Sequence, residues 1–244
     1  MDHLSGYDFK TILGISVGLD VAFAFDTSQS VSKEVLVMMK KFAKAAVTSH
    51  SVSADDSRIG VISYGKRAVT DLTLSDGIIS SAVSDAIETL TVVGGPRLMS
   101  KAIKEAIDNV FVTKSGGRIG SKKLFVIFTT GVAEGTDKTD LSEALEKLHK
   151  EKVNVVVVAV GSGMVAADFV SITKDVLKVI IIKPTMLPSM LGNFEEISSL
   201  AISKYLHLLL EIEDKYLVLR HYNQYRYDWN ECTQRSKIVK ENAL

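Results

Sequence analysis

Five stretches of the chain are nearly uninterrupted runs of apolar residues, the pattern of β-strands that are buried on both faces. They lie at residues 19–25, 58–64, 123–129, 153–160 and 177–183. The run at 68–74 instead alternates apolar and polar residues and follows a turn at Gly65 and Lys66. This run is expected to be an antiparallel partner at the edge of the sheet.

Between these runs, apolar residues recur every three or four positions, as on one face of an amphipathic helix. Such stripes extend from Val31 to Ala46, from Ile79 to Ile87, from Ala102 to Val110 and from Leu141 to Leu148. In the last of them, Asp140 and Glu143 are placed like a capping box at a helix start. The alternation predicts a doubly wound α/β fold with a mostly parallel central sheet, one antiparallel edge strand and helices on both faces.

The alternation ends near residue 205, where the character of the sequence changes. We therefore predict three segments: an N-terminal extension at 1–18, a domain at 19–205, and a C-terminal helix extension and tail at 206–244. The tail follows a long helix predicted at 194–219.

Charge and composition exclude several partners. The 244 residues carry 29 Lys and Arg against 29 Asp and Glu, and no like charges run together, so no cationic surface for nucleic acid is expected. No apolar run has the length of a membrane span, so no membrane insertion is expected. No signal peptide is predicted, and the single Cys232 cannot form an internal disulfide. The chain is expected to be either cytosolic or an excerpt of a longer secreted protein.

Candidate chemistry begins at the end of the first strand, where Asp26, Ser28 and Ser30 supply three hard oxygen donors. They could bond within the loop and cap a helix beginning at Val31. They could equally bind a divalent metal, since Mg²⁺ prefers oxygen ligands. A second candidate is the turn that starts at Gly161, which fits G-x-G-x-x-A between a strand and a helix. It would suit a nucleotide-binding α/β enzyme, although a turn that packs helix on strand explains it as well.

The segment FDTSQSV resembles the first metal-binding loop of von Willebrand factor type A domains, whose signature is D-x-S-x-S. These are the adhesion modules of integrins, matrilins and collagen VI. Further segments resemble the family in the same order: SRIGVISYGKRAVTDLTL, VVGGPRLMSKAIKEA, KKLFVIFTTG and VNVVVVAVGSG. The resemblance covers about residues 19–204 and implies a Rossmann-like fold.

The resemblance also implies a metal site at Asp26, Ser28 and Ser30, which the family completes with a threonine after a glycine pair and an aspartate at the end of the fourth strand. This chain has neither residue. The threonine's place falls at Arg97 or Leu98, and Thr130 stands at the place of the aspartate. The expectation is an incomplete site at which Mg²⁺ or another divalent cation could still bind.

Four further side chains could contribute to this edge of the sheet. Thr130, Ser100 and Glu134 are candidate substitute ligands for the missing ones. Arg97 is a candidate for direct partner binding, since a guanidinium can grip a partner's carboxylate with two hydrogen bonds and no metal.

The function that the resemblance implies is a non-enzymatic protein-interaction and adhesion module, one unit of an extracellular matrix or cell-adhesion protein. Its partner would be a protein, such as collagen or another matrix glycoprotein, bound at the carboxyl edge of the sheet. None of the five histidines lies beside a plausible nucleophile at a predicted strand end, so the sequence does not predict an enzyme. The alternatives are an intracellular scaffold subunit of the same family and the nucleotide-binding enzyme.

Overall fold

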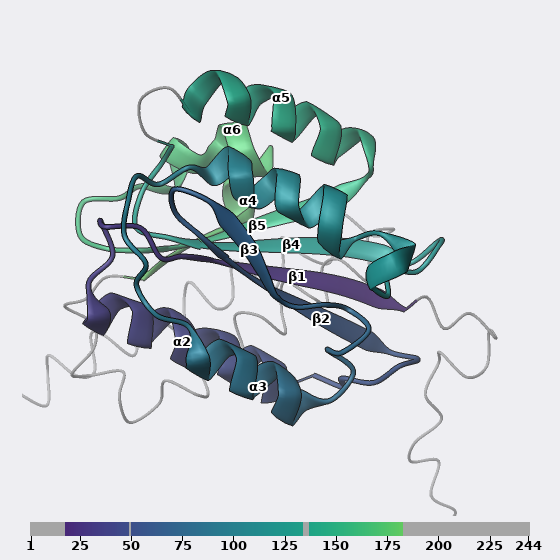
Figure 1. The fold of residues 1–244 in the computed structure, drawn as a ribbon. Helices are drawn as coiled ribbons and strands as arrows, with labels where there is room; N and C mark the ends of the chain where they lie inside the picture. Colours follow the sequence, from purple (N-terminus) through teal and green to yellow (C-terminus); the bar gives the residue numbers. More distant parts are fainter. Residues whose placement is uncertain (1–17, 49, 134–136, 183–244) are drawn as a thin grey trace, which may run out of the picture. The chain divides into compact units, whose positions relative to one another are not determined.

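The computed structural model describes residues 18–48, 50–133 and 137–182. The chain divides into two compact units, 1–203 and 204–244, and every described residue belongs to the first. The described part of this unit is a three-layer α/β structure with a central sheet (Figure 1).

Six strands form the sheet in the order β3-β2-β1-β4-β5-β6. Their bounds are Leu19–Asp26 for β1, Ser57–Tyr64 for β2, Ala68–Leu72 for β3, Lys122–Thr129 for β4, Val153–Val160 for β5 and Val179–Ile182 for β6. All neighbours pair in parallel except β2 and β3, which are antiparallel. The predicted mostly parallel sheet with one antiparallel edge strand is confirmed, and β1 lies between β2 and β4.

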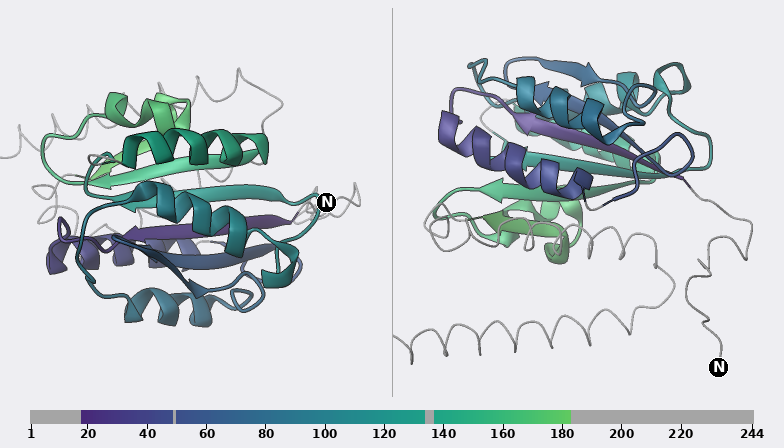
Figure 2. Two further views of the ribbon diagram at one scale, coloured as in Figure 1. Left: turned by 45° about the horizontal axis from the view of Figure 1, so that its top comes forward. Right: turned by 90° about the horizontal axis from the view of Figure 1, so that it is seen from below.

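Helices cover both faces of the sheet (Figures 1 and 2). On one face lie α2, Lys33–Thr48, and α3, Ser80–Thr89. On the other lie α4, Met99–Glu105, which continues as the π-helical turn η1, Ala106–Val110, then α5, Asp137–Lys150, and α6, Val170–Thr173. Three short 3-10 turns complete the described elements: η2 at Thr113–Ser115, η3 at Ala166–Phe169 and η4 at Val176–Lys178.

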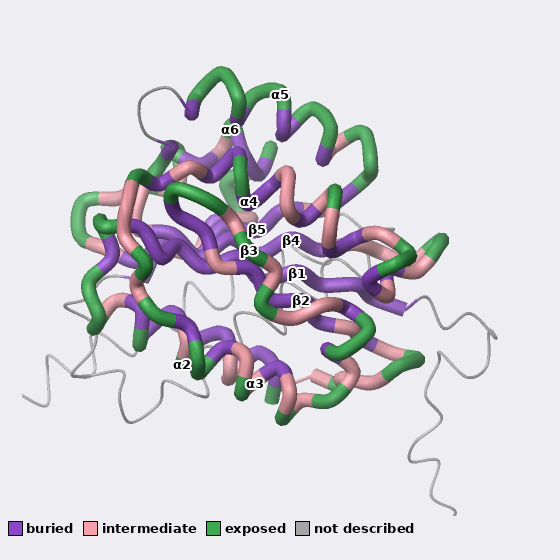
Figure 3. The backbone as a smooth tube through the Cα atoms, viewed as in Figure 1, coloured by how far each residue is buried: buried purple, intermediate pink, exposed green. Residues whose placement is uncertain are grey.

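The core follows directly from the apolar runs. All eight residues of β1 are buried, and Figure 3 shows the central strands buried along most of their length. Aromatic rings fill the layer under α2, where Phe25 and Phe128 stack with centroids 4.6 Å apart and Phe42 meets Phe128 edge-on. Such close packing on both faces holds the ends of the strands in fixed positions.

The carboxyl ends of β1, β4 and β5 share one edge, at the left in Figure 1. Backbone hydrogen bonds join two loops there: the amides of Val93 and Gly94 donate to the Thr27 carbonyl, and the Gln29 amide donates to the Gly95 carbonyl. Gly94 and Gly95 have φ values of 89° and 77°, a conformation that side chains other than glycine rarely adopt. The glycine pair thus directs the segment before α4 to the end of β1.

Several predictions concern residues outside the described ranges. These are the N-terminal extension before Gly18, the helix at 194–219 and the tail after it. The boundaries predicted for the domain, 19–205, therefore stay a prediction. Among the described residues, no helix has both the length and the apolar character needed to cross a membrane.

Candidate functional site

Asp26, the last residue of β1, is fully buried at the carboxyl edge. Its Oδ1 accepts a hydrogen bond from the Ser28 amide at 3.0 Å. Its Oδ2 forms an ion pair with Arg97 Nε at 3.0 Å and accepts a hydrogen bond from the Thr130 hydroxyl at 3.1 Å. Both carboxylate oxygens therefore have protein partners from three separate loops.

Arg97 precedes α4 and is itself buried, with 6% of its surface exposed. Besides its ion pair with Asp26, its Nη1 donates to the Val132 carbonyl at 3.2 Å. Gly131 makes room for the guanidinium, since a Cβ at this position would collide with Arg97 Nη1. The arginine side chain is thus directed inward across the ends of β1 and β4.

The three serines of the predicted site have different environments. Ser28 is fully buried, and its hydroxyl has no hydrogen-bond partner in the described part of the chain. Ser30 is exposed. Ser100 is fully buried, its amide donates to Asp137 Oδ2 at 3.2 Å, and its hydroxyl likewise has no described partner.

The candidate substitute ligands come from different elements. Thr130 lies at the site, because its hydroxyl donates to Asp26. Ser100 is the second residue of α4. Glu134 lies outside the described residues.

The helix-capping alternative needs a correction. The first helix begins at Lys33 rather than at Val31, and its start is capped by Ser32, whose Oγ accepts a hydrogen bond from the Val35 amide at 3.3 Å. The prediction that Ser28 and Ser30 cap the helix is therefore wrong. Ser32, the residue before Lys33, caps the helix, and Ser28 lies in the loop that precedes it.

Two buried polar residues near the site were not found from the sequence. Tyr64 ends β2 opposite Asp26, and burial, followed by the Asp26 charge, raises the pKa of its phenol well above the usual value. Asp137 is buried in the first turn of α5. The helix begins at Asp137, three residues before Asp140, so the prediction of a capping box at Asp140 and Glu143 is wrong. A helix N-terminus favours a carboxylate, which explains the earlier start.

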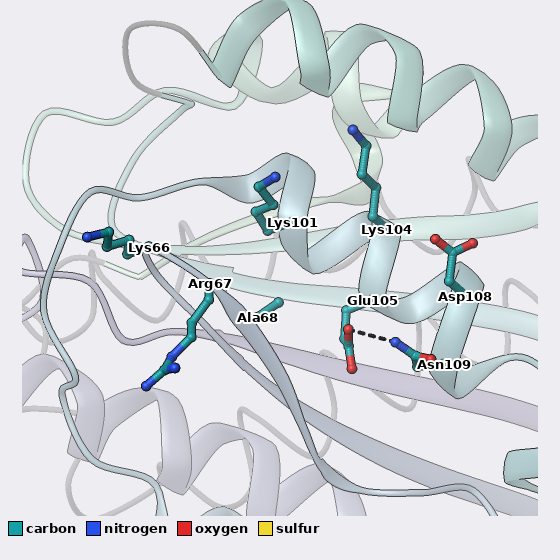
Figure 4. A pocket seen from close by; sticks show the side chains of 8 residues that line it. All are labelled: Lys66, Arg67, Ala68, Lys101, Lys104, Glu105, Asp108 and Asn109. Atoms are coloured by element: carbon teal, nitrogen blue, oxygen red, sulfur yellow. Dashed lines mark hydrogen bonds between the residues drawn. The ribbon is translucent and has the colours of Figure 1, made fainter.

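An open pocket of about 420 Å³ lies beside this edge. Figure 4 shows cations from two elements around it: Lys66 and Arg67 from the turn between β2 and β3, and Lys101 and Lys104 from α4. We call these four residues the cationic shelf. Two acids also line the pocket: Glu105 accepts hydrogen bonds from Thr70 and Asn109, and Asp108 pairs with Lys147.

The glycine turn after β5 has a local structural role. The Gly161 amide donates to the Ile182 carbonyl at 2.9 Å, and a Cβ at Gly161 would collide with Met164. The turn leads into η3 and α6, which have four residues each, instead of the longer helix that a dinucleotide motif opens. The geometry of the turn does not favour nucleotide binding.

Similar proteins agree with this fold. The chain is 30% identical to the human collagen alpha-5(VI) chain over 115 residues, which cover 47% of this chain and 4% of the collagen chain. It is 29% identical to human von Willebrand factor A domain-containing protein 2 over 59% of this chain and 18% of that protein. It is 25% identical to human matrilin-1 over 62% of this chain and 30% of that protein. The chain thus spans less than a third of the length of each of these relatives.

Solved structures show the same fold. Proximal thread matrix protein 1 from the mussel byssus has a TM-score of 0.63 at 23% identity, over 75% of this chain and 48% of that one. The Plasmodium vivax TRAP protein, solved in a manganese-loaded form, has a TM-score of 0.59 at 16% identity, over 72% of both chains. The mussel protein has also been solved with zinc in its metal-ion-dependent adhesion site. Residues 20–196 match the family model of the von Willebrand factor type A domain, and the chain belongs to this family.

Proposed function

We propose that this chain is a non-enzymatic protein-interaction module of the adhesion type, which binds a protein partner at the carboxyl edge of its sheet. The observation that carries the proposal is the convergence of three loops, those after β1, before α4 and after β4, on a rigid core at this edge. Membership of the family and the similarity to a collagen VI chain and matrilin-1 support it. The same similarities support an extracellular location as part of a longer chain.

The cationic shelf is the surface that we assign to the partner. Lys66, Arg67 and Lys101 are exposed, and each adds positive charge next to the edge. Complementary charge speeds association and selects partners, so the surface fits an acidic segment of a collagen or another matrix glycoprotein. Arg97 is a weaker candidate for this contact than the sequence indicates, because it would have to leave buried Asp26 to reach a partner's carboxylate.

The experiment is a binding assay between the immobilised chain and a panel of collagens and matrix glycoproteins. We expect the double variant Lys101→Glu and Lys104→Glu to weaken binding at least about tenfold, chiefly through slower association. Matched replacements at Lys41 and Lys44, further along α2 on the opposite face and away from the loop after β1, should leave binding unchanged.

Two outcomes would contradict the proposal. An equal loss in both double variants would indicate a general charge effect instead of a surface on one face. Binding that neither variant alters would place the contact elsewhere.

A divalent cation could take part in binding only if it displaced Arg97 from Asp26 or bound beside a guanidinium. The positive charge of Arg97 opposes either arrangement. The residues present therefore do not fit the shell that the family's metal requires.

A further inference from the structure

We infer that the guanidinium of Arg97 is an internal cation that takes the place of the divalent metal at the end of β1. Arg97 Nε lies 3.0 Å from Asp26 Oδ2, and the side chains of the two residues are 7% and 0% exposed. A buried carboxylate needs a compensating positive charge, and here the chain supplies its own.

The hydrogen-bond and ion-pair partners of the Asp26 carboxylate leave no position for a metal ion. Oδ1 accepts the Ser28 amide, and Oδ2 holds both Arg97 and the Thr130 hydroxyl. Mg²⁺ demands a nearly octahedral set of oxygens and is usually held by one or two carboxylates. Within the described ranges, no group of three or more His, Cys, Asp and Glu side chains is placed to hold a metal.

The arginine is held in this position from a second side. Its Nη1 donates to the Val132 carbonyl at 3.2 Å, and Gly131 provides the space that any larger residue would fill. Two changes relative to the family pattern therefore act together: an arginine near the place of the threonine, and Thr130 at the place of the aspartate. The arginine supplies one positive charge. With Thr130 in place of an aspartate, Asp26 is the one carboxylate that this positive charge has to balance.

Two buried hydroxyls on the segments around the site have no hydrogen-bond partner among the described residues. Ser28 Oγ and Ser100 Oγ have no partner among the described residues, whereas buried polar atoms normally have one. Ser28 belongs to the D-x-S-x-S loop, and Ser100, the second residue of α4, directly follows the segment in which the family has its threonine ligand. These hydroxyls make the site a suitable start for rebuilding metal binding.

The test is calorimetric titration with Mn²⁺ and Mg²⁺, with thermal unfolding as a second measurement. We expect no specific heat and no metal-dependent rise in Tm for the natural chain. The double variant Arg97→Thr and Thr130→Asp should bind Mn²⁺, and its Tm should rise as Mn²⁺ is added, because a ligand of the folded state stabilises it. Replacing Asp26 by Ala in this variant should abolish the binding.

The matched control is Lys101→Thr with Thr130→Asp. It makes the same change in net charge near the site but leaves Arg97 on Asp26, so it should bind no Mn²⁺. Binding by this control would overturn the inference, because removal of any nearby cation would then suffice. A heat of Mn²⁺ binding in the natural chain that Asp26→Ala removes would overturn it directly, whether or not the rebuilt variant folds. A folded double variant that binds no metal would also contradict it.

Discussion

β1 carries a buried carboxylate near each of its ends, and each pairs with an arginine from a distant loop. Asp20 pairs with Arg118 at the amino end, and Asp26 pairs with Arg97 at the carboxyl end. A glycine admits each guanidinium, since a Cβ at Gly18 would collide with Arg118 and one at Gly131 with Arg97. The two pairs have similar residues, but the hydroxyl groups near them differ in whether they have hydrogen-bond partners among the described residues.

At the amino end, the pairing is complete. Arg118 Nε and Nη2 both lie 2.8 Å from Asp20 Oδ1, and the Arg118 amide and the Ser121 hydroxyl each donate to Oδ2 at 2.7 Å. The same guanidinium donates to the carbonyls of Asp55 and Asp56. This arrangement ties the loop before β2 and the loop before β4 to β1, which is a structural role.

At the carboxyl end, Arg97 Nε lies 3.0 Å from Asp26 Oδ2, and the buried hydroxyls of Ser28 and Ser100 have no hydrogen-bond partner among the described residues. This difference supports the inference that Arg97 occupies the place of a metal ion, whereas Arg118 has the structural role of joining loops to β1.

The largest effect is expected from breaking the amino-end pair with Arg118→Met. Asp20 would stay fully buried without its counter-charge, which typically lowers the free energy of unfolding by about 3–5 kcal/mol. Urea unfolding measures this loss. Arg58→Met is the control, because the Arg58 guanidinium bonds the carbonyls of Ala54 and Gly116 and its loss should cost less. Equal losses in the two variants would mean that the Asp20 charge is not what Arg118 stabilises.

Breaking the carboxyl-end pair with Arg97→Met should cost less, about 2–3 kcal/mol. Asp26 keeps the Ser28 amide and the Thr130 hydroxyl. Arg118→Met, by contrast, also removes the hydrogen bonds to the carbonyls of Asp55 and Asp56. A double-mutant cycle with Asp26→Asn isolates the pair, and its coupling energy should be positive. A loss larger than that of Arg118→Met would reverse the order of the two ends.

The sequence predicted the fold because buried parallel strands have a simple signature. The runs at 19–25 and 153–160 fall within one residue of β1 and β5, and the alternating run at 68–74 is the antiparallel edge strand. The last run is longer than its strand, because Val176–Lys178 forms a 3-10 turn before β6. Helix starts were less accurate: the capping signal at Asp140 lies inside α5, since Asp137 precedes it and suits the helix start equally well.

The site was predicted only in part, for a reason of geometry. The sequence gives the order of Asp26, Arg97 and Thr130 along three strand ends, and a parallel sheet brings such ends together. It does not give the direction of a side chain in an irregular loop. Whether Arg97 faces a partner or Asp26 depends on the space at Gly131 and the carbonyl of Val132, both more than thirty residues away.

Alkaline pH should distinguish the two ends, because among the described residues a buried tyrosine lies beside the carboxylate at the carboxyl end and none beside Asp20. Burial and the charge of Asp26 raise the pKa of Tyr64 well above its usual value near 10. Above pH 10 the unfolded chain releases this proton and the folded chain keeps it, so stability is full below pH 10 and falls as the pH rises. The expected slope is about 1.4 kcal/mol per pH unit.

Tyr64→Phe removes this titration and should flatten the alkaline limb of a plot of unfolding free energy against pH. The variant loses a long hydrogen bond of 3.4 Å to the Phe128 carbonyl and an interaction with the Thr129 hydroxyl. The Thr129 hydroxyl keeps its bonds with Gly131, so the stability of the variant at neutral pH should change little. An unchanged alkaline limb would assign the loss to other groups.

The smallest effect compares one serine from each end. Ser121→Ala removes a hydroxyl that donates to Asp20, which should cost about 1 kcal/mol, whereas Ser28→Ala removes a buried hydroxyl without a described partner. We expect Ser28→Ala to change the free energy of unfolding by less than about 0.5 kcal/mol, since no bond is lost and a buried polar group is deleted. Urea unfolding with a chelator present measures both. A loss for Ser28→Ala as large as that for Ser121→Ala would mean that Ser28 Oγ has a partner in solution. If added Mn²⁺ then widened the gap between the natural chain and Ser28→Ala, that partner would be a cation, and Arg97 would not be its replacement.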